Sequence, residues 1–159
     1  MASSTDYTGR TIDLLTHQGI TETGSQLVSL ALYSVEAPGG QVITGIQKVV
    51  QTFLQLFLTD LGSVPSAPEL GTGFYGAVRR GEVHTQLDVR TQFGAAAETV
   101  RRHLAPVETA LPDDERFASA VLDNFNLDQA ASKLVLTITV RSRAGEARTV
   151  YLPVSLAIK

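Results

Sequence analysis

The stretch that decides the fold is residues 39–76, GGQVITGIQKVVQTFLQLFLTDLGSVPSAPELGTGFYG. A glycine pair opens it, a long amphipathic segment follows, and a loop rich in glycine and proline closes it. Apolar residues recur at spacings of three and four between positions 42 and 61, which predicts an α-helix. Gly62 is then the expected helix stop, and Pro65 and Pro68 prevent the helix from resuming.

The apolar arc of this helix is wide. One stripe consists of Val42, Ile46, Val49, Phe53 and Phe57, and the adjacent stripe of Ile43, Val50, Leu54, Leu58 and Leu61. The polar residues left to face water are Gln47, Lys48, Gln51 and Gln55. An arc of this width needs more than one neighbour to cover it, so we expect a core helix. Presentation of part of the arc to another subunit is the alternative.

Before this helix, the sequence predicts a β-hairpin. Thr11–Leu15 is typical of a short strand, Gly19 and the cluster at 21–25 indicate a turn, and Gln26–Glu36 is interpreted as the second strand. An isolated hairpin is marginal in water, so this one should lean on the rest of the chain or on a partner.

After the helix, the glycines around Phe74 and Tyr75 predict an irregular loop with two aromatic anchors. A second helix is expected over roughly 89–109. Asp88 is a candidate for its N-terminal cap, and Pro106 should end or kink it because proline lacks a backbone donor.

The last third of the chain alternates like strands. Residues 121–127 alternate loosely, Lys133–Arg141 alternates strictly, and the final strand is expected over Val150–Ile158. Pro153 cannot donate to a sheet ladder, so the final strand should be an edge or carry a bulge. The predicted fold is therefore α+β, with two main helices packed on a small, mainly antiparallel sheet. We divide it into an extension over 1–38 and a self-sufficient domain over 39–159.

Composition excludes several classes of function. The chain has 159 residues, a formal net charge of -3 and no cysteine. There is consequently no disulfide, thiol nucleophile or zinc-thiolate site, and no overall basic footprint for nucleic acid. No apolar run reaches the length of a membrane span, and the start, MASSTDYTGR, does not resemble a secretory signal. We expect synthesis and assembly in the cytoplasm, without a cofactor or a membrane.

Possible catalytic residues are few. The densest acidic cluster is Asp113-Asp114-Glu115, with Glu108 shortly before it, and a solvated or helix-capping loop is the expected setting. The three histidines, His17, His84 and His103, show no metal-binding spacing. The glycines at 71, 73 and 76 imitate a dinucleotide fingerprint, but they follow a proline loop and enclose bulky aromatic residues.

Basic residues gather at two places. Arg79 and Arg80 precede a glycine, and Arg141, Arg143 and Arg148 surround the last turn. A solvated hairpin tip is one interpretation of the second group. A docking patch for an acidic partner surface is the other, because such charges steer encounters and set register.

Three features together resemble the small baseplate wedge, or sheath-initiator, family of contractile phage tails, which includes TssE of type VI secretion systems. The first is the helix that begins with Gly45-Ile46-Gln47-Lys48 and ends with Leu58-Thr59-Asp60-Leu61-Gly62-Ser63. The second is the loop Pro68-Glu69-Leu70-Gly71-Thr72. The third is a second helix followed by a charged loop and a three-strand ending, KLVLTITV…YLPVSL. The resemblance covers about residues 40–157.

The resemblance implies a structural protein of the virion tail, not an enzyme. Such proteins lie around the tail tube, usually as six copies, and join wedge proteins to the first ring of the tail sheath protein. Family members carry a Glu-Pro-Arg tripeptide after the second helix that contacts the wedge scaffold. This chain has Pro112, Glu115 and Arg116 there in a different order, and we carry the docking role to these three residues.

The family also implies strand addition, in which the initiator offers a sheet edge to an arm of the sheath. Backbone hydrogen bonds then give affinity and alternating side-chain pockets give register. Two edges are candidates, the final strand and the N-terminal hairpin. The residues we assign to sheath binding are Arg141, Arg143, Val150, Leu152, Val154 and Leu156.

Two other functions stay open. One is a polysaccharide hydrolase of the lysozyme type with Glu108 or Glu115 as the acid, which needs two carboxylates placed in one cleft. The other is a tail-completion adaptor in a particle that has no sheath.

Overall fold

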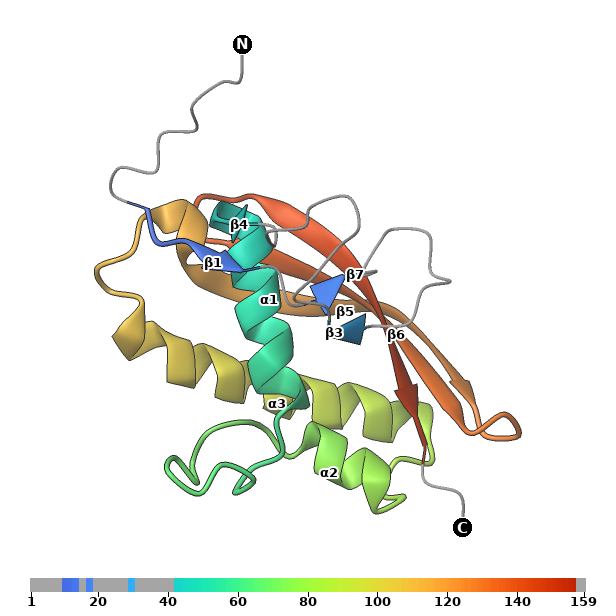
Figure 1. The fold of residues 1–159 in the computed structure, drawn as a ribbon. Helices are drawn as coiled ribbons and strands as arrows, with labels where there is room; N and C mark the ends of the chain where they lie inside the picture. Colours follow the sequence, from blue (N-terminus) through green and yellow to red (C-terminus); the bar gives the residue numbers. More distant parts are fainter. Residues whose placement is uncertain (1–9, 15–16, 19–28, 31–41, 157–159) are drawn as a thin grey trace.

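The computed structural model describes residues 10–14, 17–18, 29–30 and 42–156 (Figure 1). The helices are α1 (Gly45–Leu58), α2 (Phe74–Arg79), α3 (Gln86–Val107) and the short 3-10 helix η1 (Asp113–Glu115). The long strands are β5 (Phe117–Asp128), β6 (Lys133–Ser142) and β7 (Ala147–Ser155). Two-residue strands precede them: β1 (Asp13–Leu14), β2 (His17–Gln18), β3 (Ser29–Leu30) and β4 (Val42–Ile43). The predicted α+β class is confirmed.

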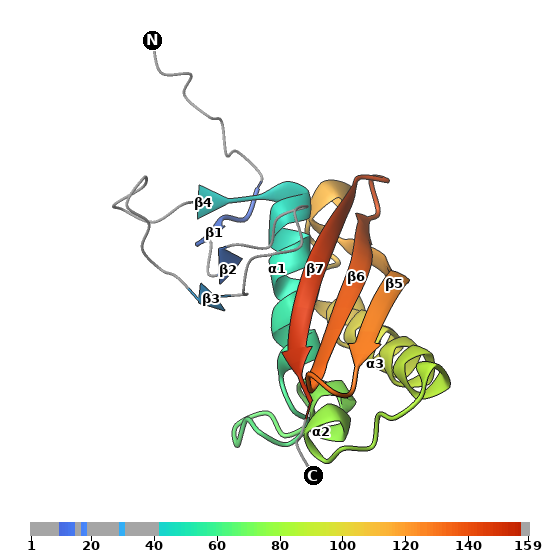
Figure 2. The ribbon, with the colours of Figure 1, turned by 90° about the vertical axis from the view of Figure 1, so that its right-hand side faces the viewer.

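The three long strands form an antiparallel sheet in the order β5-β6-β7. Figure 2 shows the sheet in front and the helices α1 and α3 behind it. Helix α1 packs on β6 and β7, and α3 packs beside β5. No described element covers the opposite face of the sheet. The two outer strands therefore leave one edge each without a strand partner among the described residues.

Five phenylalanines join the layers. The Phe57 ring lies 5.4 Å from Phe53, 4.6 Å from Phe74 and 5.5 Å from Phe93, measured between ring centroids. Phe117 of β5 stacks on Phe53 at 5.5 Å. Aromatic pairs at these distances add to the free energy gained by burial. The wide apolar arc predicted for the first helix is thus covered from two sides, by the sheet and by the other helices.

Helix α1 begins later and ends earlier than the sequence predicted. Gly45 has a φ of +58°, a left-handed conformation that separates the helix from the extended pair Val42–Ile43. At the other end Thr59 is the C-cap, so Gly62 lies in the following turn and is not the helix stop. Gln51 was expected to face water but is buried, because its amide donates to the Asp13 carboxylate at 2.9 Å.

The loop after α1 returns to the end of that helix. The Thr72 N–H donates to the Thr59 carbonyl at 2.8 Å, and Asp60 and Thr72 form a parallel bridge. Gly71 has a φ of +100°, and a Cβ there would lie 2.4 Å from the Thr59 oxygen. The two halves of the motif that carries the family resemblance therefore meet in space, and the close contact requires glycine at position 71.

Residues 74–79 form helix α2, so the prediction of an irregular loop was wrong. The buried residues Phe74, Ala77 and Val78 recur at helical spacing, a signal that the surrounding glycines obscured. Phe74 is fully buried, as expected of an aromatic anchor.

Helix α3 starts with a capping box. The Asp88 N–H donates to the Thr85 hydroxyl, and the Asp88 carboxylate accepts the Thr85 N–H at 2.8 Å. Asp88 therefore takes part in capping as predicted, although Thr85 is the N-cap residue. Pro106 lies within the last turn, and the helix ends at Val107 with Glu108 as the C-cap.

The edge position that Pro153 predicted for the final strand is confirmed. Pro153 lies in β7, which is an edge strand and pairs with β6 in unbroken register from Ser155 to Ala147. Strand β7 starts and ends earlier than the predicted final strand, since Ser155 is its last residue. Strand β5, the other edge, carries two register shifts, one after Phe117 and one after Leu122.

The N-terminal strands pair differently from the prediction. Strand β1 pairs with β4 next to α1, whereas β2 pairs with β3. The partner expected for Thr11–Leu15 was therefore wrong, because Val42–Ile43 stay extended beside it. The predicted turn at 19–25 and most of the second strand at 26–36 lie outside the described residues. The division at residues 38 and 39 stays a prediction.

Candidate functional site

The first candidate region is η1, which contains the residues assigned to wedge binding. Pro112 precedes the 3-10 turn in an extended conformation, and the Glu115 N–H donates to its carbonyl at 2.9 Å. The β6–β7 turn holds η1 from the other side, since the Ala144 N–H donates to the Asp113 carbonyl at 3.1 Å. The residues assigned from sequence thus lie together on one short turn.

Glu115 is buried, contrary to the solvated loop expected for the acidic cluster. It is 2% exposed, and its Oε2 atom accepts hydrogen bonds from the backbone and the hydroxyl of Thr11. Lys48 of α1 lies 3.5 Å from the same oxygen. The other oxygen, Oε1, is buried and has no hydrogen-bond partner. Burial of a carboxylate requires such partners, so Glu115 joins η1 to α1 and to the N-terminal segment.

Arg116 caps the C-terminal end of α3. Its guanidinium donates to the Glu108 carbonyl at 3.0 Å and to the Thr109 carbonyl, and it pairs with Asp113 at 3.2 Å. Both carbonyls lie just after Val107, the last residue of α3, where the helix dipole favours a cation, and the Glu108 carbonyl also accepts the Leu111 N–H at 3.0 Å. The side chain therefore has internal acceptors in addition to any partner it meets.

Glu108 is the second buried carboxylate. It is 7% exposed, and its Oε2 atom accepts the Phe117 N–H at 2.9 Å. Burial raises the pKa of Glu108 above its ordinary value of 4.5, and the Phe117 N–H and the charge of Arg143 oppose this shift. Glu108 and Glu115 each hold a backbone segment in place, an arrangement different from two carboxylates facing a bound sugar.

The second candidate region is the β6–β7 turn. The guanidinium-bearing residues Arg141, Arg143 and Arg148 are all exposed. Among the described residues, the ion pairs involve other arginines and none of these three. In contrast, Arg79 pairs with Asp60 and Arg80 with Glu82. Of the two basic groups predicted from sequence, the arginines of the turn are the group without ion pairs among the described residues.

The side chains assigned to sheath binding on β7 point into the core. Val150, Leu152 and Val154 are 1%, 1% and 4% exposed. Leu156, just after the strand, is half-buried, and its N–H donates to the Ser132 carbonyl at 2.8 Å. A partner strand could therefore reach this part of the chain through the backbone edge of β7, which has no strand partner among the described residues, and not through these side chains.

The two edges of the sheet are not equivalent. The register shifts in β5 mark bulges, which bend a strand and interrupt its edge. Strand β5 also carries exposed Asp123, Asn124 and Asp128 along this edge. Strand β7 has no register shift, and Pro153 removes one donor from it. Charged residues and bulges protect an edge against added strands, so β7 is the more open of the two.

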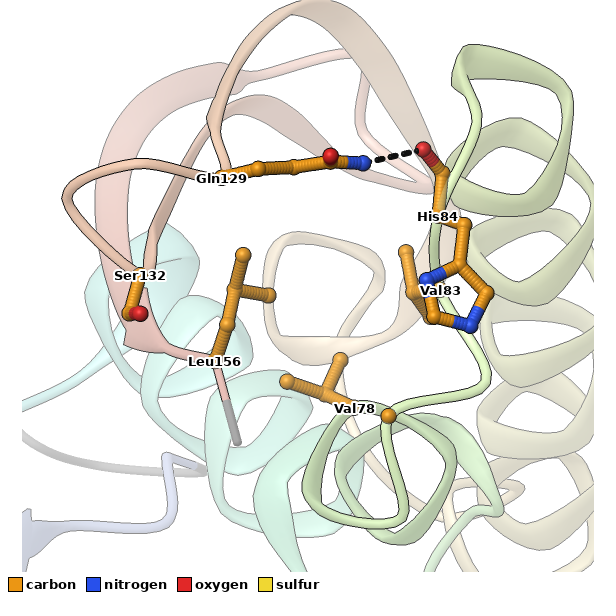
Figure 3. A pocket seen from close by; sticks show the side chains of 7 residues that line it. Val78, Val83, His84, Gln129, Ser132 and Leu156 are labelled. Carbon is orange, nitrogen blue, oxygen red and sulfur yellow. Dashed lines mark hydrogen bonds between the residues drawn. The ribbon is translucent and has the colours of Figure 1, made fainter. Parts of the chain in front are cut away.

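A pocket of about 160 Å³ lies beyond the end of the sheet. Figure 3 shows Val78, Val83 and Leu156 along its apolar wall, with the Gln129 amide donating to the His84 carbonyl at 2.7 Å across its top. It contains no carboxylate among its lining residues. A smaller depression of about 120 Å³ is lined by Ala105, Glu108, Thr109, Arg116 and Arg143. Neither pocket contains the pair of carboxylates that a glycosidase needs.

The described residues offer no group of three or more His, Asp or Glu side chains suited to a metal ion. Within the same part of the chain, no helix is both long enough and apolar enough to cross a membrane.

No protein-family model matches the sequence, and no curated protein matches it either. Among solved structures, the chain is similar to a crystal structure, at 1.44 Å resolution, of a Geobacter sulfurreducens protein provisionally described as a tail lysozyme. The TM-score is 0.42 and the identity 16%, over 82% of this chain and 99% of the other. At this level of likeness, neither the family nor the function of this chain follows from the comparison.

Sequence reasoning missed the contribution of Arg10, Thr11 and Asp13 to the η1 region. These residues contact Asp114, Glu115 and Gln51, which lie more than 35 positions further along the chain. Their only signal in the sequence is Gln51, a polar residue beside an apolar stripe of α1. Such a residue calls for a buried partner, but periodicity does not say which one.

Proposed function

We propose that this chain is a structural component of a contractile phage tail baseplate. It joins the wedge scaffold to the first sheath ring and nucleates sheath assembly by strand addition, without catalysis. Its place is the virion tail, as one of six copies around the tail tube. The observation that carries the proposal is the edge of β7, which has no strand partner among the described residues and lies beside a turn with three exposed arginines. The core behind it brings both halves of the family motif together.

On the sheath side, β7 supplies the binding edge. An added strand would gain backbone hydrogen bonds along 147–155, while the apolar side chains of β7 stay in the core. Pro153 has no backbone N–H, so an added sheath strand makes fewer backbone hydrogen bonds with β7. The missing donor also fixes the register of the added strand, because a carbonyl of that strand finds no partner opposite Pro153. Arg141, Arg143 and Arg148 lie at the turn end of this edge and would steer an acidic segment of the sheath arm towards it.

On the wedge side, η1 supplies the binding surface. Glu115 and Arg116 act by holding the turn in shape, since both side chains are engaged inside the chain. The part of η1 that a wedge protein would meet is Asp113, whose side chain is 67% exposed, together with the half-buried Pro112. The β6–β7 turn adjoins η1, since the Ala144 N–H donates to the Asp113 carbonyl at 3.1 Å, so a wedge protein on η1 and a sheath arm on β7 would bind side by side.

The test is electron microscopy of particles assembled without this gene. Bare tubes, or baseplates that carry no sheath, are the expected result. Particles with normal sheathed tails would contradict the proposal and favour a role as an adaptor. A turbidity assay on cell walls tests the absence of catalysis: clearance that disappears in both Glu108→Gln and Glu115→Gln would overturn it.

A further inference from the structure

Residues 10–13 lie between η1 and the first turn of α1, and the place they fill there is called the groove below. The Arg10 guanidinium pairs with Asp114 at 2.5 Å, and Thr11 donates both its N–H and its hydroxyl to Glu115. Lys48 of α1 donates to the Thr11 hydroxyl from the opposite wall. This segment lies outside the part of the chain that resembles the wedge family, yet it contacts the turn that carries the docking motif.

The residues that line the groove favour particular side chains in the segment that fills it. The partly exposed Asp114 pairs with the Arg10 guanidinium, and Glu115 requires donors because it is only 2% exposed. Thr11 supplies two of these donors, whereas Lys48 lies at 3.5 Å from Glu115. The remaining buried oxygen of Glu115, Oε1, still lacks a partner.

We propose that this groove is a recognition site for an extended segment in which an arginine precedes a threonine or serine. Residues 10–13 fill the groove within the same chain until a wedge protein inserts such a segment. The occupant from the partner would have to supply a cation for Asp114 and at least two donors for Glu115. A third donor would satisfy Oε1 and would favour the exchange of segments. The identity of the partner rests on the proposed function, whereas recognition of the Arg-Thr segment rests on the contacts alone.

Hydrogen exchange on the full chain tests the recognition. The variants are Thr11→Val, which keeps the shape of the side chain, and the double variant Arg10→Ala/Thr11→Val. Arg141→Ala is the matched control, because it removes an exposed arginine that has no ion pair with any described residue. We expect amide exchange over 113–117 to become about tenfold faster in the double variant, less so in Thr11→Val, and to stay unchanged in the control. Unchanged exchange in both groove variants would overturn the proposal.

A peptide then separates recognition from simple strand pairing. The probe is a synthetic peptide of residues 8–15, TGRTIDLL, added to the double variant. We expect it to slow the exchange over 113–117 again, and the same peptide with valine in place of threonine to have no such effect. Equal action of both peptides would contradict recognition through Glu115. These outcomes do not depend on a tail, so they can fail while the proposed function stands.

The exchange of segments has its own readout in assembled particles. Amides of residues 10–14 should exchange faster in the particle than in the isolated chain, because the wedge segment has displaced them. Equal or slower exchange there would show that residues 10–13 remain in the groove and would overturn displacement. If the proposed tail function itself were wrong, this chain would be absent from the assembled particle, which is a different outcome from unchanged exchange over residues 10–14.

Discussion

The η1 region and the β6–β7 turn were both predicted to bind partners, and they differ in how the chain uses their charges. In η1, Glu115 and Arg116 are engaged with Thr11, Lys48 and the end of α3. At the turn, the arginines are exposed and have no ion pair among the described residues. The same kind of residue thus stabilises the fold in one place and remains available to a partner in the other.

The difference shows which feature separates structural from binding charges. Both regions are short, polar and rich in charge in the sequence. In η1 three segments meet at Glu115, so this carboxylate is removed from water and must be paired, whereas the side chain of Asp113 in the same turn is 67% exposed. Substitutions in the two regions should therefore act on different quantities, the free energy of unfolding for η1 and association for the turn.

The largest effect is expected for Glu115→Ala. Removing one partner of a buried ion pair leaves Lys48 and the Thr11 donors unpaired, which costs about 3 kcal/mol of unfolding free energy. Chemical denaturation measures this loss. Glu115→Gln keeps an acceptor for Thr11 and serves as the control, with a smaller loss expected. A loss of unfolding free energy below about 0.5 kcal/mol in Glu115→Ala would show that Glu115, like the arginines of the β6–β7 turn, does not stabilise the fold.

Arg116→Ala should cost about 2 kcal/mol, because hydrogen bonds of a charged group to two carbonyls at the end of α3 are lost. The melting temperature and hydrogen exchange of the last turn of α3 report the loss. Arg116→Lys keeps the charge without the forked geometry and should recover only part of it. A melting temperature like that of the unaltered chain would show that the side chain is free for a partner.

Glu108→Gln should change how stability depends on pH. Burial raises the pKa of Glu108, so its stabilising contribution is complete below the ordinary value of 4.5 and is lost as pH rises through the raised value. Glutamine can still accept the Phe117 N–H and does not ionise. We expect the unaltered chain to lose stability relative to Glu108→Gln as pH rises from 4 towards neutrality. Parallel profiles, measured by thermal unfolding, would contradict this.

The smallest effect on stability is expected for alanine at Arg141, Arg143 and Arg148. Each substitution should stay within about 0.5 kcal/mol, as is usual for exposed residues. Association with the partner should become slower and depend less on salt concentration. Binding kinetics at two salt concentrations measure both. If the association rate and its salt dependence were unchanged in the variant with alanine at all three positions, the arginines of the turn would not serve partner binding, and the proposed difference between the two regions would be wrong.

The sequence was sufficient to predict those elements whose apolar pattern depends only on neighbouring residues. The α+β class, the strict alternation of β6 and the edge position signalled by Pro153 all follow from periodicity and backbone chemistry. The ends of α1 were displaced because Gly45 takes a left-handed conformation and the preceding residues pair with β1. Such a pairing depends on a distant segment, which a local pattern does not contain.

The candidate site was less predictable for a related reason. The residues around η1 were located by a motif, but their burial depends on Arg10 and Thr11, which no pattern connects with them. Inward orientation of Val150, Leu152 and Val154 could be expected from alternation. Which edge stays open became clear only from the register shifts of β5.

Cryo-electron microscopy of the assembled baseplate tests the central claim most directly. We expect a fourth strand, from another chain, paired with β7, with Arg141, Arg143 and Arg148 against an acidic surface of the same partner. A baseplate in which the edge of β7 faces solvent, or in which the added strand lies on β5, would contradict it.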